Sequence, residues 1–455
     1  MLRVAVIGSG PSGVYTAQAL VQQQAVPDVE VYVLDRLPCP YGLVRYGVAP
    51  DHEKIKSLQH TLRTVLEHPR VHFLGHVDVG TGGLDHAELR RIFHAVVYCV
   101  GAATDRRLGI PGEELPGSRS ATEFVSWYSA HPDAAAAGGF ALGRSSAVVI
   151  GVGNVAVDVA RILARAAGDL VPTDVPQPAL EALAGSGVRD VWMVGRRGPT
   201  QAKFTTKELR ELGALPGADV VVRPDELAMD PACGADPGAL PAVVRRNVDV
   251  LREWSQRPVS PPDGPRRRIH LRFYLRPAEL IGDPRDGVRA VRFERTAPDG
   301  QGGVRGTGQY EDIEAGLVLR SVGYRGVAQP GLPFDTETGT VPNAEGRVLR
   351  DGTPCPGEYV AGWIKRGPTG VIGTNRPCAK QTVGSLLEDA PGLAGRELPE
   401  DPVAALRRAG QRPVPWPGWL GIEAAEAALG QELGRTTVKI PDWDGLLEAA
   451  ARAGR

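Results

Sequence analysis

Short apolar runs recur along the chain at positions that predict the buried strands of parallel sheets. Val4–Ile7 is wholly apolar, Val29–Asp35 ends in an acidic residue, and Ala147–Ile150 is followed later by Val188–Arg197. Parallel strands are covered on both faces, so they read as near-continuous apolar runs. Segments with helical spacing separate these runs, and the pattern therefore predicts an α/β fold.

A glycine-rich turn joins the first strand to the first predicted helix. Its spacing is Gly8-x-Gly10-x-x-Gly13, and the helix covers Val14–Leu20. Such glycines permit a tight turn, a close approach to a phosphate and close packing of the helix, whose N-terminus attracts a pyrophosphate. Asp35 lies 22 residues beyond Gly13, where a ribose-binding carboxylate belongs. The segment predicts a dinucleotide-binding unit, and an ordinary crossover with a surface acid is the alternative.

A second turn of this type follows the strand that ends at residue 150. Its spacing is Gly151-x-Gly153-x-x-Ala156, and alanine is tolerated at the third position. The next strand ends in Arg196 and Arg197 instead of an acid. A carboxylate would repel a 2′-phosphate, whereas guanidinium groups hold it. This turn therefore predicts an NADP(H) site, and a solvated arginine pair is the alternative.

Two turns of this kind indicate two cofactors and two domains. The acid of the first suits the ribose of FAD, and the arginine pair of the second suits NADPH, so together they predict a flavoprotein that takes hydride from NADPH. Ala95–Glu113 and Gly316–Gly326 have similar form, like the two connections between the domains of two-dinucleotide flavoproteins. We predict two Rossmann-like domains: an FAD domain from residues 1–102 and 323–455, the latter including the C-terminal region, and an inserted NADP domain, 103–322.

Composition narrows the class further. The 52 lysines and arginines nearly balance the 53 aspartates and glutamates, which argues against a general nucleic-acid binder. No apolar run is long enough to span a membrane, and the first strand begins too early for a signal peptide, so we expect a cytoplasmic protein. None of the five cysteines forms a CxxC pair. We therefore expect no metal site and no iron–sulfur cluster in this chain.

Two further segments carry candidate chemistry. Asp51–His68 has helical spacing and places His52 at the predicted start of a helix, where a capping or surface role is the alternative to catalysis. Tyr359–Arg376 predicts a strand that runs into a glycine-rich segment. Its glycines allow backbone N–H groups to approach a flavin, and Trp363 is expected either to stack on the ring or to fill a core.

Several motifs together resemble the adrenodoxin reductase family, the ferredoxin–NADP reductases of mitochondria and actinobacteria. They include "GSGPSG", "YGLVRYGVAPDH", "GVGNVAVDVARIL", "VGRRGPTQAKFTTKELREL", "RSVGYRG" and "GWIKRGPTGVIGTN". The similarity extends to "WLGIEAAEAALG" near the end and so covers nearly the whole chain. The second and last of the six motifs separate this family from generic disulfide reductases and amine oxidases.

The resemblance implies roles for individual residues. Asp35 stands where the family usually has glutamate, and it is implied to bind the adenosine ribose. His52 and Glu211 match a polar pair near the flavin that is thought to relay protons. The implied FAD-binding residues are Gly8, Ser9, Gly10, Ser12, Gly13, Asp35, Leu43, Val77, Trp363, Gly370, Val371 and Ile372. Leu43 and Val77 are expected to contact the flavin. The implied NADP(H)-binding residues are Arg106, Asn154, Val155, Ala156, Val157, Arg196, Arg197 and Glu208, with Gly370 touching the nicotinamide.

The resemblance also implies the reaction and the partner. NADPH would pass a hydride to FAD, and electrons would then leave singly to a small, acidic ferredoxin-like iron–sulfur protein, for example one that feeds a cytochrome P450. We expect the enzyme to be a monomer. The candidate docking cations are Arg45, Lys54, Lys56, Lys365 and Arg366.

Three other functions remain open from the sequence. A glutamate-synthase-type small subunit shares the two-nucleotide plan but requires an N-terminal cysteine-rich domain. A flavin-dependent methyltransferase acting on RNA would need a basic surface and a folate site, and would leave the arginine pair idle. A non-catalytic NADP sensor would bind nucleotide without flavin reduction.

Overall fold

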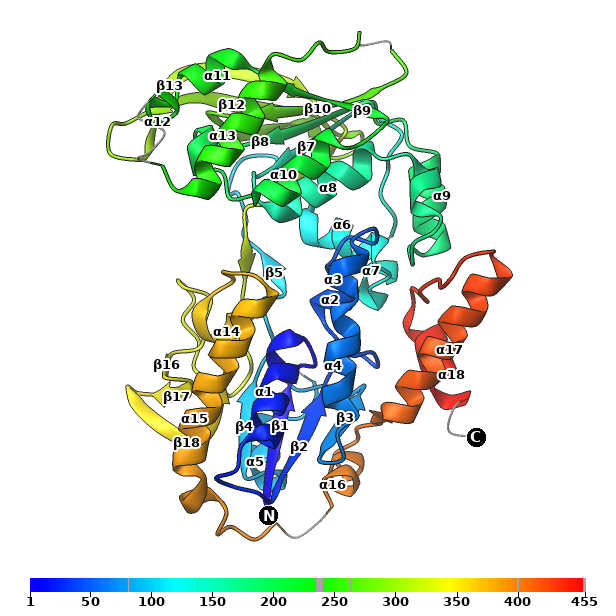
Figure 1. Ribbon diagram of the computed structural model, residues 1–455, viewed down its shortest axis with the longest axis vertical. Helices are drawn as coiled ribbons and strands as arrows, with labels where there is room; N and C mark the ends of the chain where they lie inside the picture. The colour runs from blue at the N-terminus through cyan, green and yellow to red at the C-terminus, as the bar shows by residue number, and fades with distance from the viewer. Residues whose placement is uncertain (81, 137, 235–239, 262–263, 399–400, 453–455) are drawn as a thin grey trace. The chain divides into compact units, whose positions relative to one another are not determined.

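The computed structural model describes residues 1–455 except 81, 137, 235–239, 262–263, 399–400 and 453–455. The chain forms two compact units (Figure 1). The first unit consists of Met1–Thr104 and Gly323–Arg455, and the second unit is Asp105–Val322. The second unit is therefore inserted into the first.

The first unit contains a mixed sheet with the strand order β16-β17-β18-β4-β1-β2-β3-β19. Its central strands β18, β4, β1, β2 and β3 are mutually parallel, and the outer strands run antiparallel to their neighbours. The strands are β1 (Leu2–Ile7), β2 (Val29–Leu34), β3 (Val71–Gly75), β4 (Ala95–Tyr98), β16 (Asn343–Ala344), β17 (Arg347–Arg350), β18 (Thr353–Val360) and β19 (Val414–Pro415). The chain continues from β1 to β2 on one side, and β4 lies on the other side of β1. The strand order therefore reverses at β1, and open sheets of this kind bind ligands at the carboxyl end of such a position.

Helices complete the first unit, and α1 packs against both α15 and the central strands. The helices are α1 (Pro11–Gln22), α2 (Leu43–Tyr46), α3 (Glu53–Lys56), α4 (Leu58–Leu66), α5 (His86–Ile92), α14 (Trp363–Arg366), α15 (Asn375–Leu393), α16 (Pro402–Arg408), α17 (Trp416–Glu432) and α18 (Trp443–Arg452). A separate two-stranded sheet joins β5 (Thr104–Asp105) to β15 (Tyr324–Arg325).

The expected single helix at residues 51–68 is wrong. The segment forms α3 and α4, which are separated at Ser57. Only the second of these has buried apolar residues, at Leu62, Val65 and Leu66. Because α3 buries none of its side chains, packing stabilises α4 and leaves α3 as a single turn.

The second unit contains a wholly parallel sheet with the order β6-β14-β7-β8-β10-β9. A small antiparallel sheet, β11-β12-β13, accompanies it. The strands are β6 (Ser118–Ser120), β7 (Ser146–Ile150), β8 (Asp190–Val194), β9 (Ala218–Val222), β10 (Arg267–Arg272), β11 (Leu275–Asp283), β12 (Gly287–Pro298), β13 (Val304–Glu314) and β14 (Leu317–Arg320). The helices are α6 (Ala121–Tyr128), α7 (Pro132–Ala136), α8 (Asn154–Ala164), α9 (Gln177–Ala184), α10 (Thr206–Gly213), α11 (Pro224–Ala228), α12 (Pro231–Gly234) and α13 (Ala242–Ser255).

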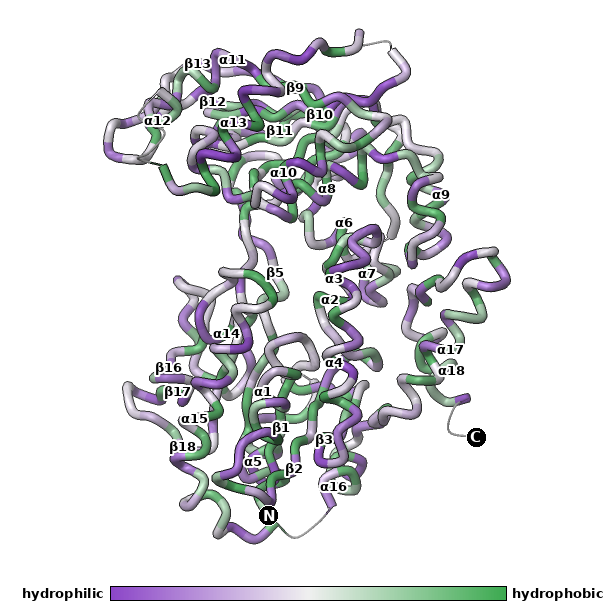
Figure 2. The backbone as a smooth tube through the Cα atoms, viewed as in Figure 1, coloured by the Kyte–Doolittle hydropathy of each residue, from purple (hydrophilic) through white to green (hydrophobic). Residues whose placement is uncertain are grey.

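Each unit has its own apolar core. The central strands carry continuous apolar residues (Figure 2), and β1 has five of its six residues buried. Each hydrophobic cluster of the described residues lies wholly within one unit. No described helix combines the length and the apolar character that are needed to cross a bilayer.

Candidate dinucleotide-binding sites

The glycine turn after β1 requires glycine for steric reasons. Gly8 has a φ of +103°, and a Cβ there would lie 2.6 Å from the carbonyl oxygen of Cys99 at the end of β4. A Cβ on Gly13 would overlap the carbonyl of Gly8, so the third glycine lets α1 pack against the end of the strand. The turn thus has the form predicted from its spacing.

The N-terminus of α1 is open to an anion. Its N-cap is Gly10, which provides no side-chain cap, and its first turn contains no acidic residue. By contrast, Asp85 and Ser120 cap α5 and α6 with their side chains. The N–H groups in the first turn of α1, where Ser12 lies, therefore remain available to bind a pyrophosphate.

Asp35 follows β2 and is fixed by hydrogen bonds. Its Oδ2 accepts from the backbone N–H of Ser9 at 2.8 Å and from the Ser9 hydroxyl at 2.6 Å, while Oδ1 accepts from the N–H of Leu37 at 2.9 Å. Burial raises the pKa of Asp35, and these donors oppose that shift. Ser9 is fully buried, and both of its donors are engaged, so its contribution is to hold the carboxylate.

Val77 lies beside Asp35. Its N–H donates to the carbonyl of Asp35 at 2.9 Å, and its side chain is buried. A cavity of about 340 Å³ adjoins this position, and Arg36, His76 and Trp443 are among its lining residues. Val77 was expected to contact the flavin, and that contact stays a prediction.

Two segments distant in sequence meet the turn of β1. Gly42 has a φ of +49°, and a Cβ on it would lie 2.8 Å from the Cα of Gly10. Gly42 precedes Leu43, whose side chain is 40% exposed. A Cβ on Gly362, which has a φ of +78°, would overlap the side chain of Ser12. The candidate FAD residues at both ends of the chain are therefore held against α1.

Trp363 offers a polar atom that suits a bound ligand. Its indole N–H is buried and has no acceptor among the described residues, and its ring packs at 5.3 Å from that of Tyr324. The segment Gly370–Ile372 follows, and Val371 is 64% exposed. A buried N–H without an acceptor is costly, and an acceptor on a flavin ring would remove that cost.

The turn after β7 repeats this design in the second unit. Gly151 has a φ of +144°, and a Cβ there would overlap the carbonyl of Ser321 at the end of β14. The N-cap of α8 is Gly153, without a side-chain cap and without an acid in the first turn. Asn154 accepts from the N–H of Thr205 at 2.8 Å, which fixes its side chain.

The remaining fingerprint residues differ in exposure. Val155 is half-buried, whereas Ala156 and Val157 are buried in the core. These two residues therefore approach a nucleotide only through their backbone. Arg106 is exposed near the start of the second unit.

Arg196 and Arg197 follow β8 directly. The side chain of Arg196 is exposed and that of Arg197 is half-buried. Within the part of the chain that the structure describes, neither guanidinium has a protein partner. Their charge is thus available to a phosphate.

The predicted residues Glu208 and Glu211 lie on α10. With Asp158 of α8 they form a group whose carboxylate oxygens lie within 4.8 Å of one another. The buried Arg161 donates to Asp158 at 3.0 Å and lies 3.6 Å from Glu211. Sequence reasoning missed Asp158 and Arg161, although their i, i+3 spacing on the fingerprint helix was visible. His52 precedes α3 in the first unit, so its pairing with Glu211 stays a prediction.

One of the expected docking cations is wrong. Arg45 is 4% exposed and donates to the equally buried Glu426 at 2.6 Å, so it presents no charge to a partner. Lys365 is partly buried and donates to Gln381 and Thr382, and burial lowers its pKa. Lys54, on α3, is fully on the surface. The remaining candidates are Lys54, Lys56, Lys365 and Arg366.

Comparisons with known proteins place the chain in a family. The profile of the pyridine nucleotide-disulphide oxidoreductase family matches residues 2–197. The NADPH-ferredoxin reductase FprA of Mycobacterium tuberculosis is 44% identical over 98% of both chains. The mitochondrial NADPH:adrenodoxin oxidoreductase of Arabidopsis thaliana is 39% identical over 99% of this chain and 95% of its own. The structure of M. tuberculosis FprA in complex with NADPH superimposes with a TM-score of 0.92 at 43% identity, covering 99% of each chain.

The two dinucleotide folds, one inserted into the other, define a two-domain flavin- and pyridine nucleotide-dependent oxidoreductase. More narrowly, the chain belongs to the adrenodoxin reductase-type family of NADPH–ferredoxin reductases. This confirms the predicted fold class, the enzyme class and the cofactors of the family, FAD and NADP(H).

Proposed function

We propose that this protein is an NADPH–ferredoxin reductase. The observation that carries the proposal is the pair of uncapped helix N-termini, α1 and α8, each preceded by a glycine turn. The first is accompanied by Asp35, and the second by Arg196 and Arg197, whose guanidinium groups have no partner among the described residues. Full-length identity of 44% to an NADPH-ferredoxin reductase supports the same reaction.

The proposed chemistry places modest demands on side chains. When bound, FAD supplies two-electron uptake from NADPH and one-electron delivery to a ferredoxin-type iron–sulfur protein. The chain orients the two nucleotides through its helix N-termini and its glycine turns. We assign to the flavin Leu43, Val77, Trp363 and Gly370–Ile372, and to the adenosine ribose Asp35.

We assign the remaining residues in the same way. Arg106, Asn154–Val157, Arg196, Arg197 and Glu208 bind NADPH, and His52 with Glu211 relays protons. The partner is an acidic ferredoxin, and one that feeds a cytochrome P450 is an option. The monomeric state and the cytoplasmic location stay predictions, which light scattering and cell fractionation test.

Visible spectroscopy tests the proposal directly. The purified protein should show flavin bands that bleach when NADPH is added without oxygen, and respond much less to NADH. It should then reduce a ferredoxin. A colourless protein, or a flavin that NADPH leaves oxidised, would reject the reaction and favour the methyltransferase or the NADP sensor.

The arginine pair provides the matched mutational test. Replacing Arg196 and Arg197 with alanine removes two charge-assisted contacts, so the KM for NADPH should rise at least about tenfold while that for NADH stays unchanged. Arg210→Ala, an exposed arginine on α10, serves as the control and should leave both values as they are. An equal response of the double arginine variant and the Arg210 control would contradict the assignment.

A further inference from the structure

The loop that carries the arginine pair is held through its backbone. The carbonyl of Arg196 accepts from the Thr296 hydroxyl at 2.8 Å, and that of Arg197 accepts from the N–H of Tyr274 at 3.2 Å. Further along, Thr200 donates both its N–H and its hydroxyl to Asp230. The two guanidinium groups have no partner among the described residues, so contacts to the backbone of the loop determine where these side chains start.

Among these contacts, the hydroxyl of Thr296 is a side-chain donor that binds the loop at Arg196 itself. The residue is fully buried in β12, and its own N–H donates to the carbonyl of Tyr274 at 2.8 Å. The register between β12 and β13 shifts next to this residue: Glu294 pairs with Tyr310 and Thr296 pairs with Gly306, so the additional residues lie on β13. The Thr296 hydroxyl itself meets the arginine loop at the carbonyl of Arg196.

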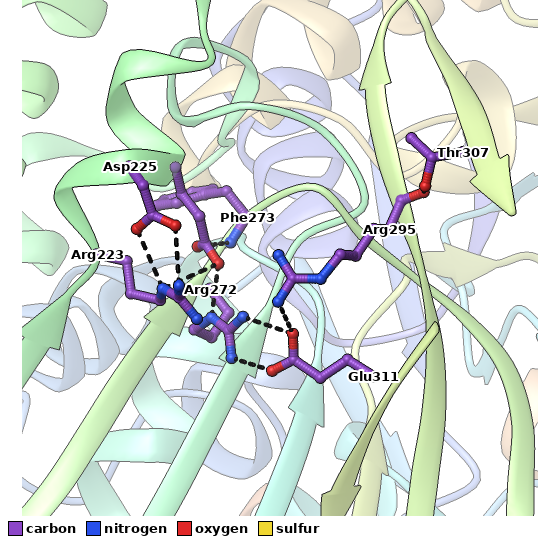
Figure 3. Close-up of polar contacts among 8 residues, drawn as sticks. Arg223, Asp225, Arg272, Phe273, Arg295, Thr307 and Glu311 are labelled. Carbon is purple, nitrogen blue, oxygen red and sulfur yellow. Dashed lines mark hydrogen bonds and ion pairs between the residues drawn. The ribbon is translucent and has the colours of Figure 1, made fainter. Parts of the chain in front are cut away.

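A charged cluster fixes the strand that carries Thr296. Arg272 of β10, which is 3% exposed, donates to Glu226 of α11 at 2.7 Å and to both carboxylate oxygens of Glu311 of β13. Arg295 of β12 donates to the same Glu311 (Figure 3). The cluster therefore links the small sheet to β10, the strand next to β8, and holds Thr296 in register. Buried ionic groups of this kind fix geometry more than they add stability.

We propose that Thr296 is a positioning residue for NADP(H) selectivity, and that the small sheet β11-β12-β13 supports the 2′-phosphate loop. The carbonyl of Arg196 fixes the plane of the peptide that joins the two arginines, and that plane sets the direction in which both side chains leave the backbone. Loss of the Thr296 hydroxyl frees this peptide to rotate. The inference rests on the NADPH preference proposed above.

Steady-state kinetics of the holoenzyme with ferricyanide as electron acceptor tests the inference. Thr296→Val removes the donor and keeps the shape, so the KM for NADPH should rise about five- to tenfold while kcat and the KM for NADH stay within twofold. Thr296→Ser should restore the wild-type values. Thr296→Ala provides a smaller side chain and should behave like the valine variant, so the inference remains testable if one variant does not fold.

The control is Thr307→Val in the same small sheet. The hydroxyl of Thr307, an exposed residue of β13, donates to the carbonyl of Arg295 at 2.7 Å. Among the described residues, no hydrogen bond joins it to Arg196 or Arg197. This variant should leave both KM values unchanged. An equal change for NADPH and NADH, a change in kcat alone, or the same change in the Thr307 variant would overturn the role of Thr296.

The two proposals fail in distinguishable ways. If the wild-type enzyme does not oxidise NADPH, or the double arginine variant leaves the KM for NADPH unchanged, the proposed function is rejected. If the arginine variant raises this KM and both Thr296→Val and Thr296→Ala do not, only the positioning role is rejected.

Discussion

Asp35 shows how a shorter side chain is fitted to a site where the family usually has glutamate. Three protein donors, two from Ser9 and one from Leu37, hold its carboxylate. The side chain of Asp35 is therefore already oriented in the absence of a nucleotide, and it would lose little conformational entropy on binding. In the proposed FAD site, Ser9 would thus connect the glycine turn assigned to the pyrophosphate with the carboxylate assigned to the ribose.

Asp35→Asn tests this arrangement at the level of one residue. Asparagine keeps only one acceptor oxygen, so either the Ser9 donors or the Leu37 N–H must face its NH2 group, and a buried donor loses its partner at a cost of about 2 kcal/mol. We expect weaker retention of FAD, measured as flavin fluorescence released at lower urea concentration than in the wild type. Asp28→Asn, on the exposed turn before β2, is the control and should release FAD as the wild type does. Equal retention by the two variants would show that Asp35 does not orient the cofactor.

At the scale of elements, a buried ion pair between Arg45 and Glu426 attaches helix α17 to the short helix α2. Glu426 accepts from Arg45 and also from the N–H of Ile440 at 2.9 Å. Lys439, which is also buried, donates to the backbone carbonyl of Arg45 at 2.6 Å. Arg45 comes two residues after Leu43, and the helix therefore supports the segment assigned to the flavin.

Glu426→Gln should strongly destabilise this attachment. The substitution leaves buried positive charge without its counter-ion, which costs about 3 kcal/mol. Urea unfolding should shift to a correspondingly lower midpoint, and FAD should be released earlier. Glu423, on the same helix α17, pairs with Arg63 of α4, and both side chains are about one-third exposed. Glu423→Gln should therefore lower the free energy of unfolding by less than about 1 kcal/mol. An equal loss of stability in the Glu426→Gln and Glu423→Gln variants would mean that burial does not determine how much each ion pair contributes.

The same elements show what sequence could and could not predict. Both glycine turns, the helices after them and the acid and arginine pair that follow were predictable, because each depends on residues close together in the chain. Arg45 was read as a docking cation because its partner Glu426 lies 381 residues away. Thr296 carried no motif, and its contact with Arg196 spans 100 residues. Such long-range partners are set by packing and leave no local pattern.

At the scale of the whole molecule, the chain has separate cores for its two candidate nucleotide sites. The clusters around β1 and β4 belong to the first unit, and those around β7 and β12 belong to the second. A ligand stabilises whichever native unit it binds, by mass action. FAD should therefore stabilise the first unit against unfolding, and NADP(H) should stabilise the second.

Calorimetry of FAD-stripped protein should make this division visible. We expect two overlapping thermal transitions: added FAD raises the midpoint of one and NADP⁺ that of the other. At a ligand concentration one hundred times its Kd, each gain is about 2.7 kcal/mol. With Arg197→Ala the shift caused by NADP⁺ should shrink and the shift caused by FAD should persist, because this arginine belongs to the second unit. A single transition that both ligands raise together would show instead that the two cores unfold as one cooperative system.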